Sequence, residues 1–425
     1  MPPKSAASAP GSRSCSEREN TITNDAASET SARSYKSRIT TASKLAKKNP
    51  EFADWAKAVK VDPAIKTNLP NDSKFGRIKK LQSDSKELPG WLRDPESKEF
   101  DRIPPVYQKW KNTLCSKLKD DPRYRFNESK DLTVPFAIGL ILQVYYHDTK
   151  IKESDRAALK SETDVRFSID NLVMYSCDAD GDELLVYSTE QKLKLPSIKS
   201  SQLSSQVDVS STTADGIISL DLIQFKPYTL NFPQIQTLLS ALSTESLTLN
   251  LILVHFVAEY KHDEGENQMK MGVVSALYQK KMLGIEGQFV FGLFQFSGDG
   301  LAVVAGVWQD GKIQFYEVGT YTRQSPASLV ELYFLLRAIK RLAAEYKTEL
   351  EKSSTELMSR IKVNPPADEW AARETDTVPE VLEDPSDEPQ QAGRSNIPQR
   401  MSQALSKLEQ WDANDRINAY NKSVR

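Results

Sequence analysis

Cysteine and histidine are scarce in this chain of 425 residues, which has three of each. Cys15, Cys115 and Cys177 lie far apart, and none belongs to a Cys-x-x-Cys pair. This excludes a disulfide framework and a zinc site of the usual spacing. The histidines show no metal-binding spacing either. We therefore expect a protein of a reducing, intracellular compartment, either nuclear or cytoplasmic.

Long apolar runs are also absent. The longest, residues 247–257, is interrupted by Thr248, Asn250 and His255 and is too short to span a bilayer. The first twenty or so residues lack the apolar segment of a secretory signal. We therefore expect no membrane partner. The formal net charge of −2 gives no overall attraction to polyanions, so a nucleic-acid partner would have to be bound by a local patch.

The N-terminal part of the chain has few aliphatic residues. Residues 1–48 are mostly Ser, Ala, Thr, Arg and Lys, with nine basic and four acidic side chains, and we expect a disordered arm there. This basic arm is a possible supplementary contact for nucleic acid, although such tails are usually only solvated. Residues 49–104 place scattered apolar anchors among many charges. That pattern favours a poorly structured segment with short helices that dock on a larger body.

The C-terminal part is equally poor in core-forming residues. Residues 353–396 are expected to form an acidic, proline-rich linker, since segment 365–389 holds nine acidic residues, one basic residue and five prolines. Within residues 397–425, Met401, Leu405, Leu408 and Trp411 follow helical spacing, which predicts an amphipathic helix.

Residues 105–352 carry the pattern of one α/β domain. Residues 249–261 are apolar on both faces for most of their length, as expected of a central strand. A helix is expected over 265–283, strands over 289–296 and 301–308, and a closing helix over 328–352. We expect a mixed sheet flanked by helices, with the central strand between 289–296 and the strand after Asp215.

Two charged residues stand at the end of the central strand. Glu259 and Lys261 are separated by one residue, so the period of a strand places both side chains on one face. Charges at a partly buried strand end are costly unless they pair or bind a ligand. A carboxylate can hold Mg²⁺, and a lysine beside it can orient water and offset phosphate charge. A solvated ion pair is the alternative interpretation.

A metal site needs a second carboxylate. Asp215 is the best candidate because it directly precedes a short apolar strand, residues 216–222. It also precedes Gly216, and Asp-Gly is a common turn pair, so a turn is the alternative. Asp208 and Asp221 lie close enough in sequence to compete for the same role.

The order of a strand with Asp, a connection, a strand with Glu-x-Lys and a helix resembles the PD-(D/E)XK nuclease superfamily. It is most similar to the nuclease-like domains of fungal proteins, in which Asn-Gln opens the helix, as Asn267 and Gln268 do here, and Leu-Gly-Ile ends it, as residues 283–285 do. The resemblance covers residues 155–345. Two features depart from the pattern: Ala214 replaces the usual proline, and 44 residues separate Asp215 from Glu259.

The resemblance implies a restriction-endonuclease-like fold and a role for each matching residue. Asp215 and Glu259 would be metal ligands, with Glu162 as an additional acidic ligand. Lys261 would be the catalytic lysine, and Gln268 would lie near the phosphate. The implied activity is hydrolysis of phosphodiester bonds in DNA or RNA with Mg²⁺, or Mn²⁺, as cofactor. The alternative is an inactive nuclease-like fold that serves as an interaction module; the oligomeric state is left open.

Overall fold

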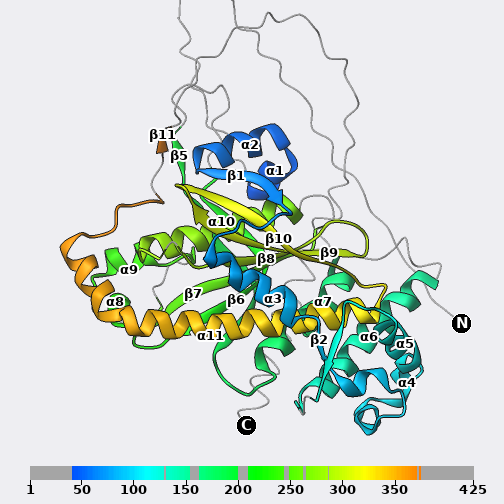
Figure 1. The fold of residues 1–425 in the computed structure, drawn as a ribbon. Helices are drawn as coiled ribbons and strands as arrows, with labels where there is room; N and C mark the ends of the chain where they lie inside the picture. Colours follow the sequence, from blue (N-terminus) through cyan, green and yellow to red (C-terminus); the bar gives the residue numbers. More distant parts are fainter. Residues whose placement is uncertain are drawn as a thin grey trace, which may run out of the picture. The chain divides into compact units, whose positions relative to one another are not determined.

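A seven-stranded mixed sheet is the centre of the computed structural model (Figure 1). The structure describes residues 41–128, 131–153, 162–199, 209–243, 248–261, 265–285, 287–370 and 373–374. The strands of the sheet, in spatial order, are β1 (Val61–Lys66), β10 (Lys312–Thr322), β9 (Gly300–Gln309), β8 (Val290–Gln295), β7 (Leu251–Glu259), β6 (Ser211–Leu222) and β4 (Leu185–Lys194). The pairs β1–β10 and β7–β8 are parallel, and the other neighbours are antiparallel.

Helices surround this sheet. They are α1 (Ala42–Lys47), α2 (Asn49–Ala58), α3 (Gly76–Asp84), α4 (Pro105–Gln108), α5 (Lys111–Lys119), α6 (Val134–Glu153), α7 (Glu162–Asp178), α8 (Lys226–Thr229), α9 (Pro233–Leu239), α10 (Gly265–Met282) and α11 (Pro326–Val363). Three short 3₁₀ helices lie at Ser73–Phe75, Gly90–Arg93 and Lys98–Arg102. Two small parallel ladders join β2 (Glu87–Pro89) to β3 (Arg125–Asn127) and β5 (Ile198–Lys199) to β11 (Arg373–Glu374).

Strand β7 is buried on both faces, which confirms the prediction of a central strand. Val254 and Val257 pack into one core together with residues of α10, such as Val273. Phe256, on the other face of the strand, packs into a second core together with residues of α11, such as Ile339. The strand lies between β6 and β8, inside the sheet, as its mostly apolar sequence predicts. The mixed sheet flanked by helices is thereby confirmed.

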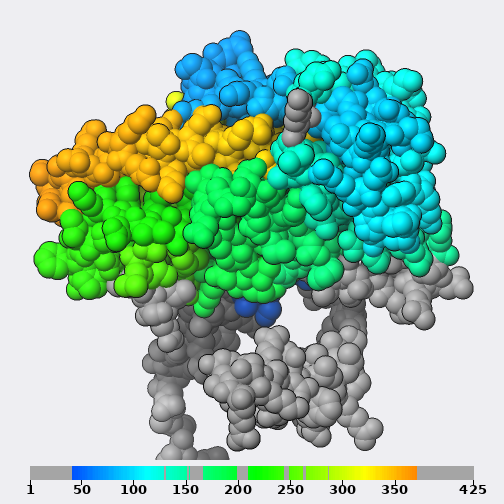
Figure 2. Space-filling model, turned by 90° about the horizontal axis from the view of Figure 1, so that it is seen from below, coloured from blue at the N-terminus to red at the C-terminus, as the bar shows by residue number. Residues whose placement is uncertain are grey.

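Helix α10 approaches the sheet closely because it carries a glycine at the contact. A Cβ atom built on Gly272 would lie 2.6 Å from Cγ1 of Val257 on β7. The absence of that carbon lets the helix backbone pack directly over the strand. Helix α11 covers the opposite face and forms a continuous yellow-to-orange ridge in Figure 2, beside the residues coloured green. Both faces of the sheet are therefore shielded where β7 ends.

The N-terminal arm predicted for residues 1–48 is too long. Residues 1–40 lie outside the described part of the chain, but α1 follows directly, capped by Thr41, whose Oγ1 accepts from the backbone N–H of Lys44 at 3.3 Å. Leu45 and Ala46 are buried. The few apolar residues in this otherwise polar segment are therefore enough to pack one short helix against the core. Segment 49–104 contributes helices, as expected, and also the edge strand β1, which was not expected.

The linker predicted for 353–396 begins too early. Helix α11 continues to Val363 because Leu357 and Ile361 remain on its buried face. Beyond it, Trp370 packs against α9 and donates its indole N–H to the carbonyl of Leu238 at 2.9 Å. The rest of the linker and the helix predicted within 397–425 lie outside the described residues. Among the helices that the structure describes, none is long and apolar enough to cross a membrane.

Replacing Gly272 with alanine should destabilise the fold, because the added methyl would overlap Val257. Overpacking of this kind costs about 1–3 kcal/mol in the free energy of unfolding, which urea denaturation measures. Gly139→Ala in α6 is the matched control, since a Cβ there meets no atom within 4 Å. That variant should be stabilised by about 0.4–1 kcal/mol. Equal effects at both positions would contradict the packing described for α10.

Candidate functional site

The predicted site residues lie where β6, β7 and α10 meet. Gly216 of β6 pairs with Ala258 of β7, and the next position in this antiparallel register sets Asp215 opposite Glu259. Opposed residues of neighbouring strands have Cβ atoms about 4.5–5.5 Å apart. Asp215 lies within β6 rather than in a turn, so the turn interpretation is wrong. The two carboxylates come from neighbouring strands, 44 residues apart in sequence.

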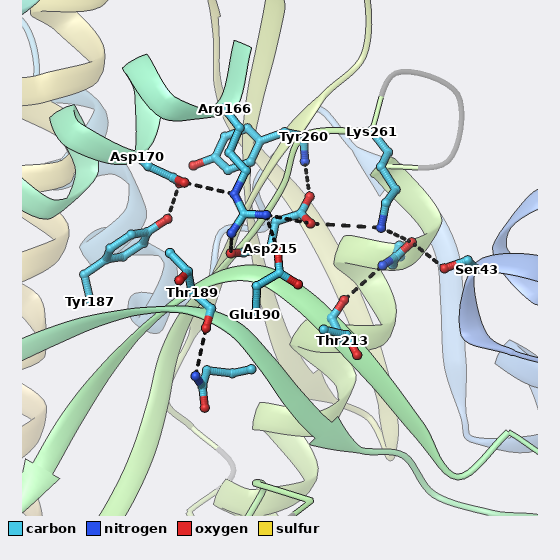
Figure 3. Close-up of polar contacts among 12 residues, drawn as sticks. Ser43, Arg166, Asp170, Tyr187, Thr189, Glu190, Thr213, Asp215, Tyr260 and Lys261 are labelled. Atoms are coloured by element: carbon cyan, nitrogen blue, oxygen red, sulfur yellow. Dashed lines mark hydrogen bonds and ion pairs between the residues drawn. The ribbon is translucent and has the colours of Figure 1, made fainter. Parts of the chain in front are cut away.

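Asp215 is held by the strand opposite and faces two cations. Its Oδ2 accepts from the backbone N–H of Tyr260 at 2.9 Å. Its Oδ1 lies 4.0 Å from Nζ of Lys261 and 3.6 Å from Nη1 of Arg166. Figure 3 shows Arg166 on one side of Asp215 and Lys261 on the other. The carboxylate is therefore fixed in orientation and electrostatically balanced within the protein.

Gln268 links Lys261 to the surrounding backbone. It is buried in the first turn of α10, and its Oε1 accepts from Nζ of Lys261 at 3.4 Å. Its Nε2 donates to the carbonyl of Thr213 at 3.0 Å, which fixes the amide orientation. Ser43 of α1 also donates to Gln268 Oε1 at 3.4 Å. Gln268 is thus in contact with the lysine, and the contact orients the ammonium group.

Glu259 and Glu162 are the two other residues predicted to bind the metal. Glu259 is completely buried at the end of β7 and does not belong to the described residues that line the neighbouring pocket. Glu162 is the first residue of α7, and its side chain is not described. The metal-binding role of Glu162 therefore remains a prediction. The acidic competitor Asp221 lies six residues along β6 from Asp215, about 20 Å away, and Asp208 lies outside the described residues.

Arg166 of α7 is a site residue that the sequence did not reveal. Its Nε donates to Asp170 at 3.0 Å, Nη1 contacts Glu190, and Nη2 donates to the carbonyl of Asp215. Burial lowers the pKa of Arg166, but the hydrogen bonds to Glu190 and Asp170 and the charge of Asp215 outweigh it and raise that pKa. The spacing of Arg166 and Asp170 by four residues signals a helical ion pair. Nothing in that spacing points to Asp215.

Tyr187 of β4 completes this side of the site. Its hydroxyl donates to Asp170, and burial, followed by the nearby charge of Asp170, raises the pKa of the phenol above its ordinary value. The ring lies over Gly216, where a Cβ atom would come within 2.2 Å of the hydroxyl oxygen. Gly216 therefore allows β6 to pass beneath the tyrosine next to Asp215.

Glu190 is a second residue that sequence reasoning missed. It adopts a left-handed backbone, with φ of 54°, which is costly for a residue other than glycine. Thr189 pairs with Gly216 and Gln191 with Ala214, so Glu190 lies opposite Asp215 across β4 and β6. Its side chain is 63% exposed and contacts Arg166. Glu190, Asp215 and Glu259 thus follow one another across three adjacent strands.

The formal charges of this cluster suit a divalent cation. Asp170, Glu190, Asp215 and Glu259 supply four carboxylates, against the two cations Arg166 and Lys261. Among the described residues, no group of three or more His, Cys, Asp or Glu side chains is placed to hold a metal ion. Mg²⁺ nevertheless needs only one or two protein carboxylates, because water and substrate phosphates complete its coordination. The donor chemistry of Asp215 and Glu259 fits that requirement.

The buried histidine is not part of this chemistry. His255 lies in β7 between the rings of Phe291 and Tyr346, and burial lowers its pKa to about 3. It therefore stays neutral as a core residue.

Comparison of the chain with protein-family models, curated proteins and solved structures finds no match. The functional interpretation consequently depends on the geometry of the site.

Removing the cation of Arg166 should destabilise the fold, because the carboxylates of Asp170 and Asp215 would lose their partner in a half-buried region. Arg166→Met is expected to lower the free energy of unfolding by about 2–4 kcal/mol, as measured by urea denaturation. The control is Arg341→Met, whose side chain is 56% exposed and pairs with Asp84 at 3.2 Å. That change should cost less than about 1 kcal/mol. A loss below about 1 kcal/mol for Arg166→Met as well would show that Arg166 behaves as a surface cation.

Proposed function

We propose that this chain is a Mg²⁺-dependent nuclease with a restriction-endonuclease-like fold, which hydrolyses phosphodiester bonds in DNA or RNA. The observation that carries the proposal is the contact of Asp215 and Gln268 with Lys261, two residues beyond Glu259 at the end of β7. They lie on β6, at the end of β7 and in the first turn of α10, in the strand–strand–helix order of the PD-(D/E)XK resemblance. Mn²⁺ would be an alternative cofactor.

Asp215 and Glu259 are the residues that would hold the ion. A bound Mg²⁺ lowers the pKa of a coordinated water and offsets charge on the phosphate. The backbone N–H of Tyr260 keeps the Asp215 carboxylate in place, so its orientation does not depend on a ligand. Glu259 is fixed by its position at the end of a strand that is buried on both faces. The Asp215 carboxylate is thus positioned by the sheet before substrate arrives.

Lys261 would act on the reacting phosphate. Its ammonium group is oriented by Gln268 Oε1 and lies beside Asp215. The side chain is 30% exposed, so the remaining N–H donors can reach an incoming water or a phosphate oxygen. A fixed cation there stabilises the negative charge that develops during phosphodiester cleavage. Gln268 serves as a positioning residue for this lysine.

A second function is favoured by the ion pairs of Asp215. Because Arg166 and Lys261 both lie within 4.0 Å of Oδ1, the carboxylate is balanced by the protein's own cations. A nuclease-like fold that has lost metal binding would have such a site. In that case the chain would be a nucleic-acid or protein interaction module. Metal binding by the wild-type chain distinguishes the two functions.

Lys261→Ala should reduce metal-dependent cleavage about 10²–10⁴-fold while leaving the fold and most nucleic-acid binding unchanged. The reason is that the ammonium group acts on the transition state rather than on ground-state binding. The measurement is cleavage of single- and double-stranded DNA and RNA with Mg²⁺ or Mn²⁺, with circular dichroism as the test of folding. Lys57→Ala, an exposed residue of α2, is the matched control and should cleave normally.

Variants of the proposed metal ligands separate metal binding from the chemical step. Asp215→Asn and Glu259→Gln should weaken Mg²⁺ binding in calorimetry, since each removes a charge and keeps the side-chain size. Asp221→Asn, at the far end of β6, and Asp208→Asn should bind Mg²⁺ as the wild type does. A wild type that binds neither Mg²⁺ nor Mn²⁺ and cleaves none of the substrates would falsify the nuclease proposal in favour of the interaction module.

A further inference from the structure

The two cations that flank Asp215 are held differently. Lys261 is 30% exposed, and its Nζ makes two long contacts, at 3.4 Å to Gln268 Oε1 and at 4.0 Å to Asp215 Oδ1. Arg166 is 16% exposed. Its Nη1 lies 3.6 Å from Asp215 Oδ1, and its Nη2 donates to the backbone carbonyl of the same residue. The guanidinium is therefore tied to strand β6 itself, whereas the ammonium group is held by its end alone.

Two other carboxylates hold Arg166 in place. Its Nε donates to Asp170 Oδ2 at 3.0 Å, and its Nη1 contacts Glu190. Asp170 is fixed in turn, because its Oδ1 accepts from the hydroxyl of Tyr187. Turning Arg166 away from Asp215 would therefore break ion pairs with two further side chains. The guanidinium is consequently a fixed charge of the site.

A ligand would approach Asp215 from the side of Lys261. Asp215, Lys261 and Gln268 line a pocket of about 550 Å³, and Arg166 does not belong to the described residues around it. Figure 3 shows Lys261 and Arg166 on opposite sides of Asp215. A ligand in the pocket can therefore displace the ammonium group from Asp215, but it cannot displace the guanidinium.

The fixed charge of Arg166 opposes a metal ion at Asp215. An ion bound through Oδ1 at the usual Mg²⁺–oxygen distance of about 2.1 Å would lie within about 6 Å of Nη1, which is 3.6 Å from that oxygen. The two positive charges repel each other, and more strongly where burial limits screening by water. Asp215 is such a place, since its side chain is only 7% exposed. Removing the guanidinium while leaving Asp170 and Glu190 would therefore make the site more attractive to the ion.

We propose that Arg166 lowers the metal affinity of Asp215, so that a divalent ion is bound tightly only together with the phosphates of a nucleic-acid strand. The inference rests on the proposed nuclease function, because it describes how metal binding at that site is regulated. A phosphate in the pocket would draw Lys261 away from Asp215 and supply negative charge that offsets the fixed guanidinium. The ion and the strand then strengthen each other's binding by the same factor, as linked equilibria require.

Titration calorimetry of the full chain with Mn²⁺ at low ionic strength, without nucleic acid, tests the role of Arg166. Arg166→Met should bind Mn²⁺ about 10–100-fold more tightly than the wild type, because the fixed charge is gone. Arg166→Lys keeps the charge and should stay within about threefold of the wild type. The matched control is Lys192→Met. Lys192 is exposed, lines the same pocket and has no ion pair among the described residues, so its loss should change the affinity less than about threefold.

Strand binding gives the reciprocal measurement. A labelled single-stranded oligonucleotide with non-hydrolysable phosphonate linkages is titrated with the full chain in Mn²⁺ or in EDTA, and binding is followed by fluorescence anisotropy. Mn²⁺ should tighten binding to the wild type at least about 10-fold, because the coupling between ion and strand is mutual.

Stability measurements keep the test valid for a destabilised variant. Because the carboxylates left in Arg166→Met repel each other, bound Mn²⁺ should raise the urea midpoint of this variant more than that of the wild type. A merely structural arginine would give a variant whose stability Mn²⁺ does not restore. Failure of the variant to fold at saturating Mn²⁺ would overturn the proposal, since the ion would then not replace the lost charge.

The outcomes separate this inference from the nuclease proposal. If Arg166→Met binds Mn²⁺ more tightly and Mn²⁺ strengthens strand binding by the wild type, but the wild type cleaves nothing, the role of Arg166 stands and the nuclease proposal fails. If the wild type cleaves, and Arg166→Met binds Mn²⁺ no more tightly than the wild type, the role of Arg166 is overturned and the nuclease stands. Equal tightening in Arg166→Lys, or no effect of Mn²⁺ on strand binding, would also overturn it.

Discussion

The burial of β7 on both faces is the constraint from which the rest of the structure follows. In a strand covered by α10 on one face and α11 on the other, a polar residue in the middle, such as His255, stays neutral, and charged residues are found only at the end of the strand. Glu259 and Lys261 stand at that point, and the close approach allowed by Gly272 brings the first turn of α10 over them. The position of Gln268 beside Lys261 is a consequence of this packing, not of local sequence.

The electrostatics of the site depend on the same geometry. Asp215 is buried beside Arg166 and Lys261, and its second oxygen accepts from the Tyr260 backbone. Arg166 keeps its charge because Asp170 and Glu190 hold it. The cluster therefore has more carboxylates than cations but no isolated charge at Asp215. A divalent ion would have to compete with the ammonium group and the guanidinium for that carboxylate, so metal affinity is the property that distinguishes the two proposed functions.

Much of the fold could be predicted from the sequence because its signals are local. The mostly apolar run of β7, the helical period of α10 and the charge pair at the end of the strand are each recognised within about twenty residues. Strand β1 and helix α1 were not predicted, since each is short and stable only through contact with β10 or α10, far along the chain. Their burial depends on partners more than 200 residues away.

The residues of the candidate site, too, could be predicted only in part from the sequence. Asp215, Lys261 and Gln268 are brought together, as expected from their order along strands and helix. Arg166 and Glu190 could not be assigned, because a helical arginine and a strand glutamate have no special pattern. Their roles come from the register of β4 on β6 and from the packing of α7 beside it. Only the three-dimensional arrangement reveals such residues.

The central claim, that Asp215 and Glu259 share a metal ion, is tested most directly by a crystal soaked with Mn²⁺. The account predicts an anomalous difference peak between the two side chains, about 2.0–2.3 Å from a carboxylate oxygen of each, with Lys261 on the same side. Loss of this peak in Asp215→Asn crystals would confirm the assignment of the ligand. A fully occupied Mn²⁺ at another position, or no peak at saturating Mn²⁺, would contradict the account.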